Sequence, residues 1–478
     1  METNSGDRIG SGTRLILGLA LCGLALAPNR GWGQGESVVI AGVTVIDGTG
    51  APAQEGMTVV MRDGRISALH TGPANEIGAD VLYVDGSGKY LIPGLWDMHV
   101  HLAKAGENAF PVLVANGITG VRDMGGDPAV VGSWRSEIRR GERTGPRIFW
   151  AGPMLESETR FERMRRRGTI EPVARFRIPV RDPAAADSVI NVLAALGVDF
   201  VKVRTVQSVE TYQALAGAAS RQGLHLAGHS LGLPLELLID AGQRSVEHVV
   251  LPSLQKRSSA DRERLIAELS TRRIAMVPTV VNYFSSIARS HDELAALIAD
   301  SAGTADPRRR FVHGYLLDDW TEQLAEKPRG LRGWLVRIFT RRAYRNAERD
   351  LKEMHQGGVW IFPGTDLAVL GIYPGFSLHE ELRHFVDLIG MTPMEALVSA
   401  TRLPANFLGI ADSIGTIGVG KVADLVLLDA NPLEDIANVA RVHAVLLNGQ
   451  YLSRAFLDSL LETATVTAPA FQRGVEPE

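Results

Sequence analysis

The chain has 478 residues, which is long enough for more than one domain, although one large α/β barrel would take up most of this length. Its 50 Lys and Arg residues nearly balance its 54 Asp and Glu residues. This balance excludes a strongly basic or acidic protein, so we expect no nucleic-acid partner and a small molecule as the binding partner.

The N-terminus predicts a secretory signal peptide over residues 1–27. Two arginines precede an apolar stretch, Leu15–Ala27, that ends in an Ala-Leu-Ala sequence typical of a cleavage site. The stretch is short for a membrane span, and an uncleaved anchor is the alternative. Cys22 is the only cysteine, and Leu21 before it is too large for a lipoprotein signal. We therefore expect a periplasmic or secreted mature protein without disulfides and without stable membrane association.

Strand-like segments occur at both ends of the remaining chain. Short β-branched runs with Asp-Gly turns predict strands in Ser37–Ile46, Thr58–Leu69 and Val81–Val84. The same pattern returns in Ala423–Leu428 and His443–Asn448. We predict that residues 36–90 and 413–460 build one small β-sandwich and that 461–478 form a C-terminal tail.

The middle of the chain, residues 91–412, alternates helical segments with short apolar strands. Examples are Ala184–Leu196 followed by FVKVR, Thr211–Arg221 followed by LHLAGH, and Arg262–Thr271 followed by AMVPTVV. The fold class is therefore α/β, and the number of repeats favours a closed (β/α)₈ TIM barrel over an open doubly wound sheet. An insertion near 284–345 is longer than a connection needs, and it is predicted to be either a helical lid over the barrel mouth or a surface excursion without a catalytic role.

Two histidines one residue apart end the apolar run LIPGLWDMHVHL. In a strand, His99 and His101 point to the same face and can converge on one metal ion. By itself such a pair is more often structural than catalytic, so further ligands are needed.

Further ligand-type residues occur at the ends of other predicted strands. They are His229 in LHLAGHS, His248 in SVEHVV and Asp366 in IFPGTD. Lys202, in DFVKVRT, lies within an apolar strand, where a bare ammonium group is costly to bury. The carboxyl ends of barrel strands meet at one face, so these side chains are predicted to share one site.

This set of residues resembles the metal-dependent amidohydrolase superfamily. The tail TRLPANFLGIADSIGTIGVGKVADLVLLDANPLEDI is similar to its imidazolonepropionase-like and Xaa-Pro dipeptidase-like branches. The resemblance extends over nearly all of the mature chain, from Val38 to about Leu452.

The resemblance implies two divalent metal ions, with zinc as the default identity. It implies that His99, His101 and Asp366 bind the more buried ion, and that His229 and His248 bind the outer ion. Lys202 would be carboxylated on its amine and bridge the two ions as a carbamate anion. Asp366 would also be the catalytic proton carrier, while a hydroxide that bridges the ions attacks the substrate.

The predicted function is hydrolysis of an amide bond in an N-acyl amino acid or a dipeptide, including the Xaa-Pro type. The same site would also suit a lactam or other cyclic amide, an ester or a phosphotriester, because the metals do not define the leaving group. Deamination is less favoured, and a non-catalytic binding protein on this fold is the third alternative. Symmetric self-assembly is a frequent property of soluble proteins, so a homo-oligomer is compatible with the sequence.

Weaker candidates surround this set. Arg204 follows Lys202 by two residues and would either clamp a substrate carboxylate or pair with a loop carboxylate, and Tyr283 is a weaker candidate for the substrate pocket. Four further residues are expected to be structural rather than catalytic: Asp123, His225, His379 and His384. The stretch GTIGVGKV has the spacing of a phosphate loop, but it lacks the final Ser or Thr and precedes a strand.

Overall fold

Strands from the two ends of the chain lie in one sheet. The computed structural model describes residues 37–73, 81–168, 171–229, 233–248 and 254–465. The predicted signal peptide and most of the predicted C-terminal tail lie outside these ranges.

Strands and helices alternate through most of the described chain. The strands are β1 (Ser37–Val45), β2 (Gln54–Arg62), β3 (Arg65–Thr71), β4 (Val81–Asp85), β5 (Tyr90–Pro93), β6 (Leu95–Val100), β7 (Ile118–Asp123), β8 (Arg147–Trp150), β9 (Met154–Ser157), β10 (Arg177–Val180), β11 (Val201–Val203), β12 (Leu226–Gly228), β13 (Ser245–Glu247), β14 (Ala275–Val277), β15 (Leu425–Leu428), β16 (Val442–Leu447) and β17 (Gln450–Leu452). The α-helices are α1 (Leu102–Ala105), α2 (Ala109–Ala115), α3 (Pro128–Arg140), α4 (Glu158–Arg166), α5 (Ala186–Ala195), α6 (Val209–Arg221), α7 (Leu235–Asp240), α8 (Ser259–Thr271), α9 (Val280–Asn282), α10 (His291–Ala299), α11 (Gly314–Glu326), α12 (Gly330–Gln356), α13 (Phe376–His384), α14 (Pro393–Ala400), α15 (Arg402–Phe407) and α16 (Arg454–Thr465). Two short π-helices are η4 (Tyr283–Ile287) and η6 (Phe385–Ile389).

The sheet formed by the two ends has eight strands in the order β17-β16-β15-β5-β1-β2-β3, with β4 paired to β1. β5 is the junction, because it pairs with β1 on one side and with β15 on the other. An ion pair between Lys89 and Asp429, 340 residues apart, lies beside this junction. The two ends therefore meet as one sheet, and its layering as a sandwich stays a prediction.

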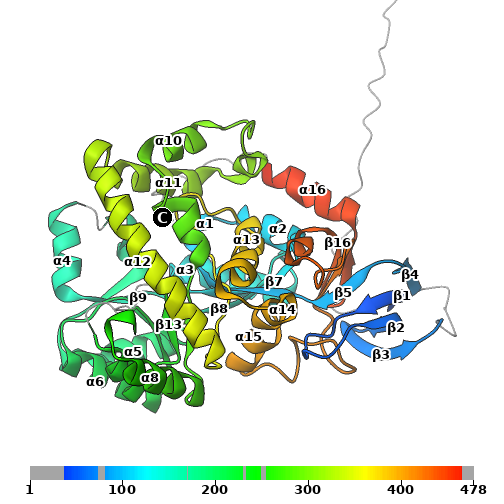
Figure 1. Ribbon diagram of the computed structural model, residues 1–478, viewed down its shortest axis with the longest axis horizontal. Coiled ribbons are helices and arrows are strands. Elements are labelled where there is room, and N and C mark those ends of the chain that lie inside the picture. The colour runs from blue at the N-terminus through cyan, green and yellow to red at the C-terminus, as the bar shows by residue number, and fades with distance from the viewer. Residues whose placement is uncertain (1–36, 74–80, 169–170, 230–232, 249–253, 466–478) are drawn as a thin grey trace, which may run out of the picture. The chain divides into compact units, whose positions relative to one another are not determined.

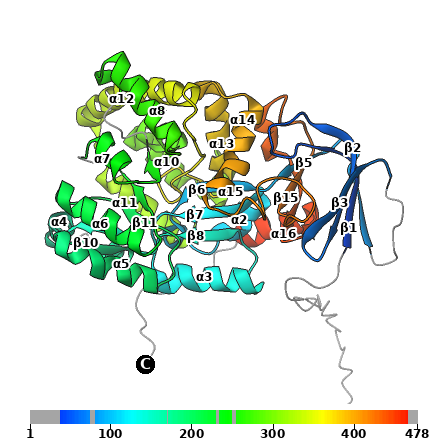
Figure 2. The ribbon, with the colours of Figure 1, turned by 90° about the horizontal axis from the view of Figure 1, so that it is seen from below.

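The middle of the chain forms parallel sheets with helices against them. One sheet has the order β6-β7-β8 and the other has the order β10-β9-β11-β12-β13-β14. In Figure 2, α3 runs along β8, which it contacts, and α5 lies beside α6. Such parallel strands with helical connections are typical of α/β proteins.

Backbone hydrogen bonds link the edges of these parallel sheets. The amide of Phe362 donates to the carbonyl of Met276 in β14 at 2.9 Å, and the amide of Met98 in β6 donates to Pro363 at 2.9 Å. The amide of Asp199, just before β11, donates to Trp150 in β8 at 2.9 Å. These links and the parallel strands fit the predicted TIM barrel.

The run LIPGLWDMHVHL is divided at Gly94. Residues before it belong to β5 in the sheet of the two ends, and residues after it belong to β6 in a parallel sheet. A Cβ atom at Gly94 would lie 2.0 Å from the hydroxyl oxygen of Thr119, so only glycine allows this close approach.

Two element boundaries differ from those expected. The run AMVPTVV is not one strand, because β14 ends at Val277 and Thr279 adopts a left-handed φ of 49° before α9 begins. The long insertion contains α10, α11 and α12, and α12 continues to Gln356, past the predicted end of the insertion.

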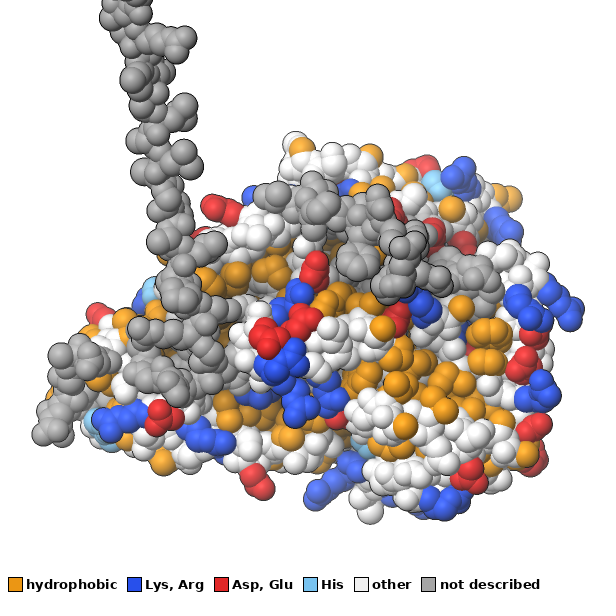
Figure 3. Space-filling view, turned by 180° about the vertical axis from the view of Figure 1, so that it is seen from behind, with side chains coloured by type: hydrophobic (Ala, Val, Ile, Leu, Met, Phe, Trp, Pro, Cys, Tyr) orange, Lys and Arg blue, Asp and Glu red, His pale blue; other side chains and the backbone are white. Residues whose placement is uncertain are grey.

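The surface carries both charged and hydrophobic side chains. No helix within the described ranges is both long enough and apolar enough to span a lipid bilayer. Figure 3 shows positive and negative side chains next to each other at the centre of the face opposite to that of Figure 1, with hydrophobic side chains gathered beside them.

The packing of β6 against β7 depends on a glycine. A Cβ atom at Gly120 would lie 2.3 Å from the ring of Trp96, which is buried. We expect Gly120→Ala to lower the free energy of unfolding by about 1–3 kcal/mol, because the ring has to shift in a packed core. The measurement is the midpoint of urea unfolding. The matched control is Gly217→Ala in α6, where the nearest side-chain atom lies 3.5 Å away. It should leave stability unchanged or raise it by about 0.5–1 kcal/mol, and equal stability of the two variants would contradict the packing argument.

Candidate metal centre and active site

The histidine pair lies where β6 ends. His99 is within β6 and fully buried, and His101 is the first residue after the strand. Their Nε2 atoms lie 3.5 Å and 3.4 Å from the same carboxylate oxygen of Asp366. The ligand-type atoms of these three side chains all lie within 4.8 Å of one another. The structure therefore brings together the residues predicted for the buried metal ion.

The two single histidines lie next to this group. His229 follows β12 and His248 follows β13, so both stand at the carboxyl ends of parallel strands. The rings of His229 and His248 are 4.7 Å apart between centroids, and those of His99 and His248 are 4.6 Å apart. His248 Nδ1 also lies 3.8 Å from the second oxygen of Asp366.

Lys202 is the central residue of β11 and is buried. Its Nζ has no hydrogen-bond partner among the described residues. Burial lowers the pKa of Lys202 to about 8, although the charges of Glu247 and Asp366 oppose this shift. A larger fraction of this amine is therefore neutral at pH 7 than for a lysine in water, and carbon dioxide adds only to the neutral amine.

Two buried nitrogens in this site, Nζ of Lys202 and Nε2 of His99, have no hydrogen-bond partner among the residues that the structure describes. Orphaned buried polar atoms are costly unless a bound group satisfies them. Imidazole nitrogens and a carboxylate are ordinary ligands of divalent transition metals. The donor set therefore fits a metal centre.

The histidine rings are oriented through their other nitrogens. Nδ1 of His99 lies 2.8 Å from Glu247, Nδ1 of His101 lies 3.0 Å from the carbonyl of Gly125, and Nδ1 of His248 lies 2.9 Å from the hydroxyl of Thr279. Such second contacts hold a ligand ring in place and leave the opposite nitrogen for a metal.

Two of the clustered residues have unusual backbone conformations. His248 has φ of 65° and Asp366 has φ of 56°, both in the left-handed region that non-glycine residues rarely adopt. Local strain of this kind persists where surrounding contacts hold the chain in place, and it gathers at functional sites.

A buried ionic network contacts the cluster, and its residues were not among those predicted for the site. The guanidinium of Arg122 in β7 donates to both oxygens of Glu247 in β13 at 2.8 and 2.9 Å, and all these atoms are buried. Burial alone would raise the pKa of Glu247, but Arg122 and the hydrogen bond with His99 hold it well below its usual range. Charged residues within the apolar strands GVRDM and SVEHVV were the available signal.

Asp366 is held by an amide that was also missed. Nδ2 of Asn282 donates to Asp366 at 3.0 Å, and Asn282 ends the short helix α9. The start of α9 is fixed by the buried carboxylate of Glu381, which accepts from the amides of Val280 and Val281. No spacing in the sequence connects these residues, because they come from different elements.

The two weaker substrate candidates are differently placed. Arg204 pairs with Glu156 at 3.4 Å, so its partner is a carboxylate of the protein, although one within β9 rather than in a loop. Tyr283 is buried and stacks on Tyr344 of α12, with ring centroids 3.8 Å apart. It therefore connects the segment after Asn282 to the long helix.

The four residues that were expected to be structural each contact other parts of the protein. Asp123 accepts hydrogen bonds from the amides of Leu102 and Gly125, and His379 lies 2.9 Å from the carbonyl of Asn116. The ring of His225 stacks on Phe200, and that of His384 stacks on Phe284. The GTIGVGKV stretch contains no helix.

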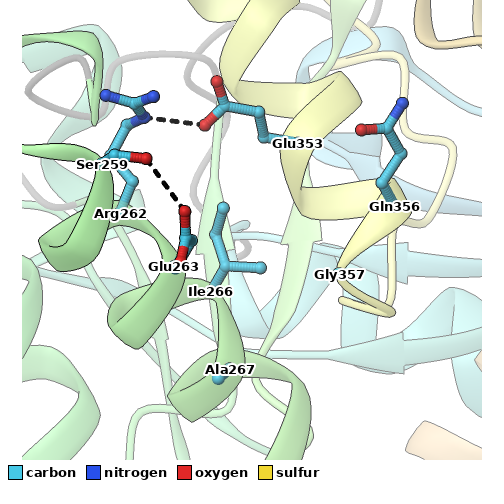
Figure 4. A pocket seen from close by; sticks show the side chains of 8 residues that line it. All are labelled: Ser259, Arg262, Glu263, Ile266, Ala267, Glu353, Gln356 and Gly357. Atoms are coloured by element: carbon cyan, nitrogen blue, oxygen red, sulfur yellow. Dashed lines mark hydrogen bonds and ion pairs between the residues drawn. The ribbon is translucent and has the colours of Figure 1, made fainter.

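A pocket lies apart from this cluster, between α8 and the end of α12. It has a volume of about 430 Å³, and the residues that line it are Ser259, Arg262, Glu263, Ile266, Ala267, Glu353, Gln356 and Gly357. Figure 4 shows an ion pair across it between Arg262 and Glu353, at 2.9 Å. None of the clustered histidines lines it.

The fold is that of an α/β protein, and it gathers ligand-type side chains at the carboxyl ends of parallel strands. The Amidohydrolase family model matches residues 90–452. The chain belongs to the amidohydrolase family. This confirms the prediction of an amidohydrolase, a hydrolase acting on carbon–nitrogen bonds.

Known proteins support the predicted branch. The imidazolonepropionase of Brucella suis (strain ATCC 23445 / NCTC 10510) is 23% identical over 394 residues, covering 78% of this chain and 87% of that protein. A putative prolidase from Bifidobacterium longum has a TM-score of 0.65 at 24% identity, covering 90% of this chain and 99% of that one. The structure of a Xaa-Pro dipeptidase with bound methionine in its active site has a TM-score of 0.66 at 22% identity, covering 87% and 100%.

Removing the buried negative charge of Glu247 should destabilise the protein. We expect Glu247→Gln to lower the free energy of unfolding by roughly 3–5 kcal/mol, because Arg122 stays buried without its charged partner. The measurement is urea unfolding followed by circular dichroism. The matched control is Glu353→Gln at the half-buried ion pair with Arg262, where water still reaches both groups, and for which we expect roughly 0–1 kcal/mol. If both variants unfold at the wild-type midpoint, the network does not carry this role.

Proposed function

We propose that the protein is a binuclear metal-dependent hydrolase that cleaves an amide bond in an N-acyl amino acid or a dipeptide, including the Xaa-Pro type. The observation that carries the proposal is the convergence of six ligand-type side chains, two of which have a buried nitrogen without a hydrogen-bond partner in the described part of the chain. The set is His99, His101, Lys202, His229, His248 and Asp366.

His99, His101 and Asp366 would hold one divalent ion, and His229 and His248 would hold the other. Lys202, carboxylated on its amine, would connect the two, with zinc as the default metal for this donor set. When bound, the ions supply an activated water and polarise the scissile carbonyl.

The side chains of the protein then orient and move the proton. Asp366 accepts the proton of the attacking water and passes it to the leaving nitrogen, because its carboxylate lies beside all of the clustered histidines except His229. The amide of Asn282 holds the carboxylate in this position. Glu247 and Thr279 keep the rings of His99 and His248 aimed into the site.

The proposal includes the architecture and the location. The parallel sheets would close into a (β/α)₈ barrel through the segment at 360–363, and the sheet of the two ends would fold into a small sandwich. The predicted signal peptide supports a periplasmic or secreted protein. The prolidase-type and imidazolonepropionase relatives support amide hydrolysis as the reaction.

Lys202 gives the sharpest test of the metal centre. We expect Lys202→Ala to lower bound metal and activity by at least about tenfold, since a bridging ligand is lost. Metal content is measured by elemental analysis, and amine release from N-acetyl amino acids and Xaa-Pro dipeptides reports activity. Formate or acetate should restore part of both in the variant by replacing the lost carboxylate.

The control is Lys352→Ala, because Lys352 pairs with Glu348 on the exposed side of α12. It should bind metal and turn over substrate as the wild type does. A wild-type protein with less than one ion per chain, or full activity in Lys202→Ala, would overturn the proposal.

A further inference from the structure

The helix α11 lies beside the two loops that carry the proposed ligands His101 and Asp366. The first loop leads from the end of β6 into α1, and the second leads from Asp366 to α13. α11 contacts α1, and Figure 1 shows the two helices next to each other. The insertion that was predicted as a lid or a surface excursion therefore reaches the ligand loops themselves.

One face of α11 packs against the second loop. Leu316 and Trp320 are buried and belong to one hydrophobic cluster with Ala368 of that loop. Asp319 and Gln323 flank them on the same side of the helix, because residues three and four apart are neighbours on a helix surface. Segments that move as lids have few buried apolar contacts, so this packing fixes α11 against the loop.

The side-chain amide of Gln323 bonds to the backbone of the second loop. Its Nε2 donates to the carbonyl of Ala368 at 2.9 Å, and its Oε1 accepts from the amide of Leu370 at 3.0 Å. Both loop residues are buried, so water has little access to these backbone groups. Gln323 thus takes the place that a neighbouring strand would have beside this part of the loop.

The loop that Gln323 holds contains two residues in rarely adopted backbone conformations. Asp366 has φ of 56°, and Ala368 has φ of 112°. Such conformations persist only where the surrounding structure holds them. The hydrogen bond from Gln323 to the carbonyl of Ala368 holds the second of them. Without this bond the loop would relax, and the carboxylate of Asp366 would move with it.

A second hydrogen bond from the same nitrogen links Gln323 to the first loop. Nε2 of Gln323 also donates to Asp319 at 2.6 Å, and the other oxygen of Asp319 accepts from Nζ of Lys104 at 2.9 Å. Lys104 lies in α1, and its amide donates to the carbonyl of His101 at 3.1 Å. A continuous chain of hydrogen bonds therefore runs from the loop after Asp366, through α11, to the turn that begins at His101.

Backbone hydrogen bonds join the starts of the same two loops. The amide of Asp366 donates to the carbonyl of His99 at 2.7 Å, and the amide of His101 donates to the carbonyl of Leu367 at 3.0 Å. The contacts with α11 lie further along both loops. The ligands His101 and Asp366 are thus held from two sides, by the backbone of β6 and by α11.

We propose that Asp319 and Gln323, called the α11 brace below, are positioning residues of the metal centre. They hold the loops of His101 and Asp366 at the separation that the inner metal ion needs. This inference rests on the proposed function and gives the insertion a role within it, because α11 is then a fixed support of the site rather than a lid. Contacts that orient metal ligands commonly change metal affinity or activity by about 10–100-fold.

The first test replaces the amide of Gln323 by an apolar group of similar size. We expect Gln323→Leu to weaken Zn²⁺ binding, measured by competition with a chelator, by about tenfold. At saturating Zn²⁺, kcat for N-acetyl amino acids and Xaa-Pro dipeptides should fall by a similar factor, with KM within about twofold of the wild type. In chelator-treated protein, hydrogen–deuterium exchange should be faster in the peptide that contains Leu370.

A second pair of variants keeps the site polar and tests the hydrogen bonds themselves. Gln323→Glu still accepts from Leu370, but it cannot donate to Ala368 and places a carboxylate beside Asp319, so it should also weaken Zn²⁺ binding. The double variant Asp319→Asn/Gln323→Glu should recover part of this loss. In the double variant the hydrogen bond between positions 319 and 323 forms again with donor and acceptor exchanged.

The matched control is Gln222→Leu. Gln222 is exposed at the end of α6 and donates to Asn191 of α5 at 2.8 Å, outside the ligand loops. Loss of this hydrogen bond should leave Zn²⁺ binding, kcat and the exchange of the Leu370 peptide as they are in the wild type.

The results distinguish failure of the α11 brace from failure of the proposed function. Wild-type Zn²⁺ affinity and kcat in Gln323→Leu and Gln323→Glu would overturn the brace and leave the hydrolase proposal standing. A lower urea midpoint without a change in Zn²⁺ affinity or kcat would also overturn it, because the contact would then serve stability alone. A wild-type protein with less than one ion per chain would overturn the proposed function, while faster exchange at Leu370 in Gln323→Leu would still assign the support of this loop to Gln323.

Discussion

The carboxylate of Glu247 is the interaction on which the site depends. It lies at the end of β13, holds the guanidinium of Arg122 from β7 and orients the ring of His99 from β6. All three groups are buried, so none of the charges can be satisfied by water. One side chain therefore joins three strands and sets the direction in which the first proposed metal ligand points. The rest of the cluster is arranged around that ring.

The ligand-type residues could be found from the sequence because of a simple geometric rule. Parallel strands present their carboxyl ends at one edge, so His229, His248 and Lys202 could be assigned to a common site from their place in each strand. His99 and His101 could be placed on one face because side chains two residues apart in a strand point to the same side. The supporting groups could not be assigned in this way. Arg122 meets Glu247 only because of which strands face each other across the interior, and local sequence does not contain that information.

Arg204 illustrates the same limit. Its position two residues after Lys202 indicated the correct side of the strand, but its partner depends on where β9 and α4 bring Glu156 and Arg160. The end of β14 was also mispredicted, because Val280 and Val281 have strand-forming side chains yet begin a helix. The carboxylate of Glu381 accepts both of their amides and thereby overrides local propensity.

The junction at β5 has a consequence for how the chain is made. β5 needs β15 as its neighbour, and the ribosome completes β15 only after the whole middle region has been synthesised. Until then one edge of β5 has unpaired backbone groups, and the parallel strands form beside an incomplete sheet. Contacts this distant in sequence slow folding and lengthen the exposure of apolar strands.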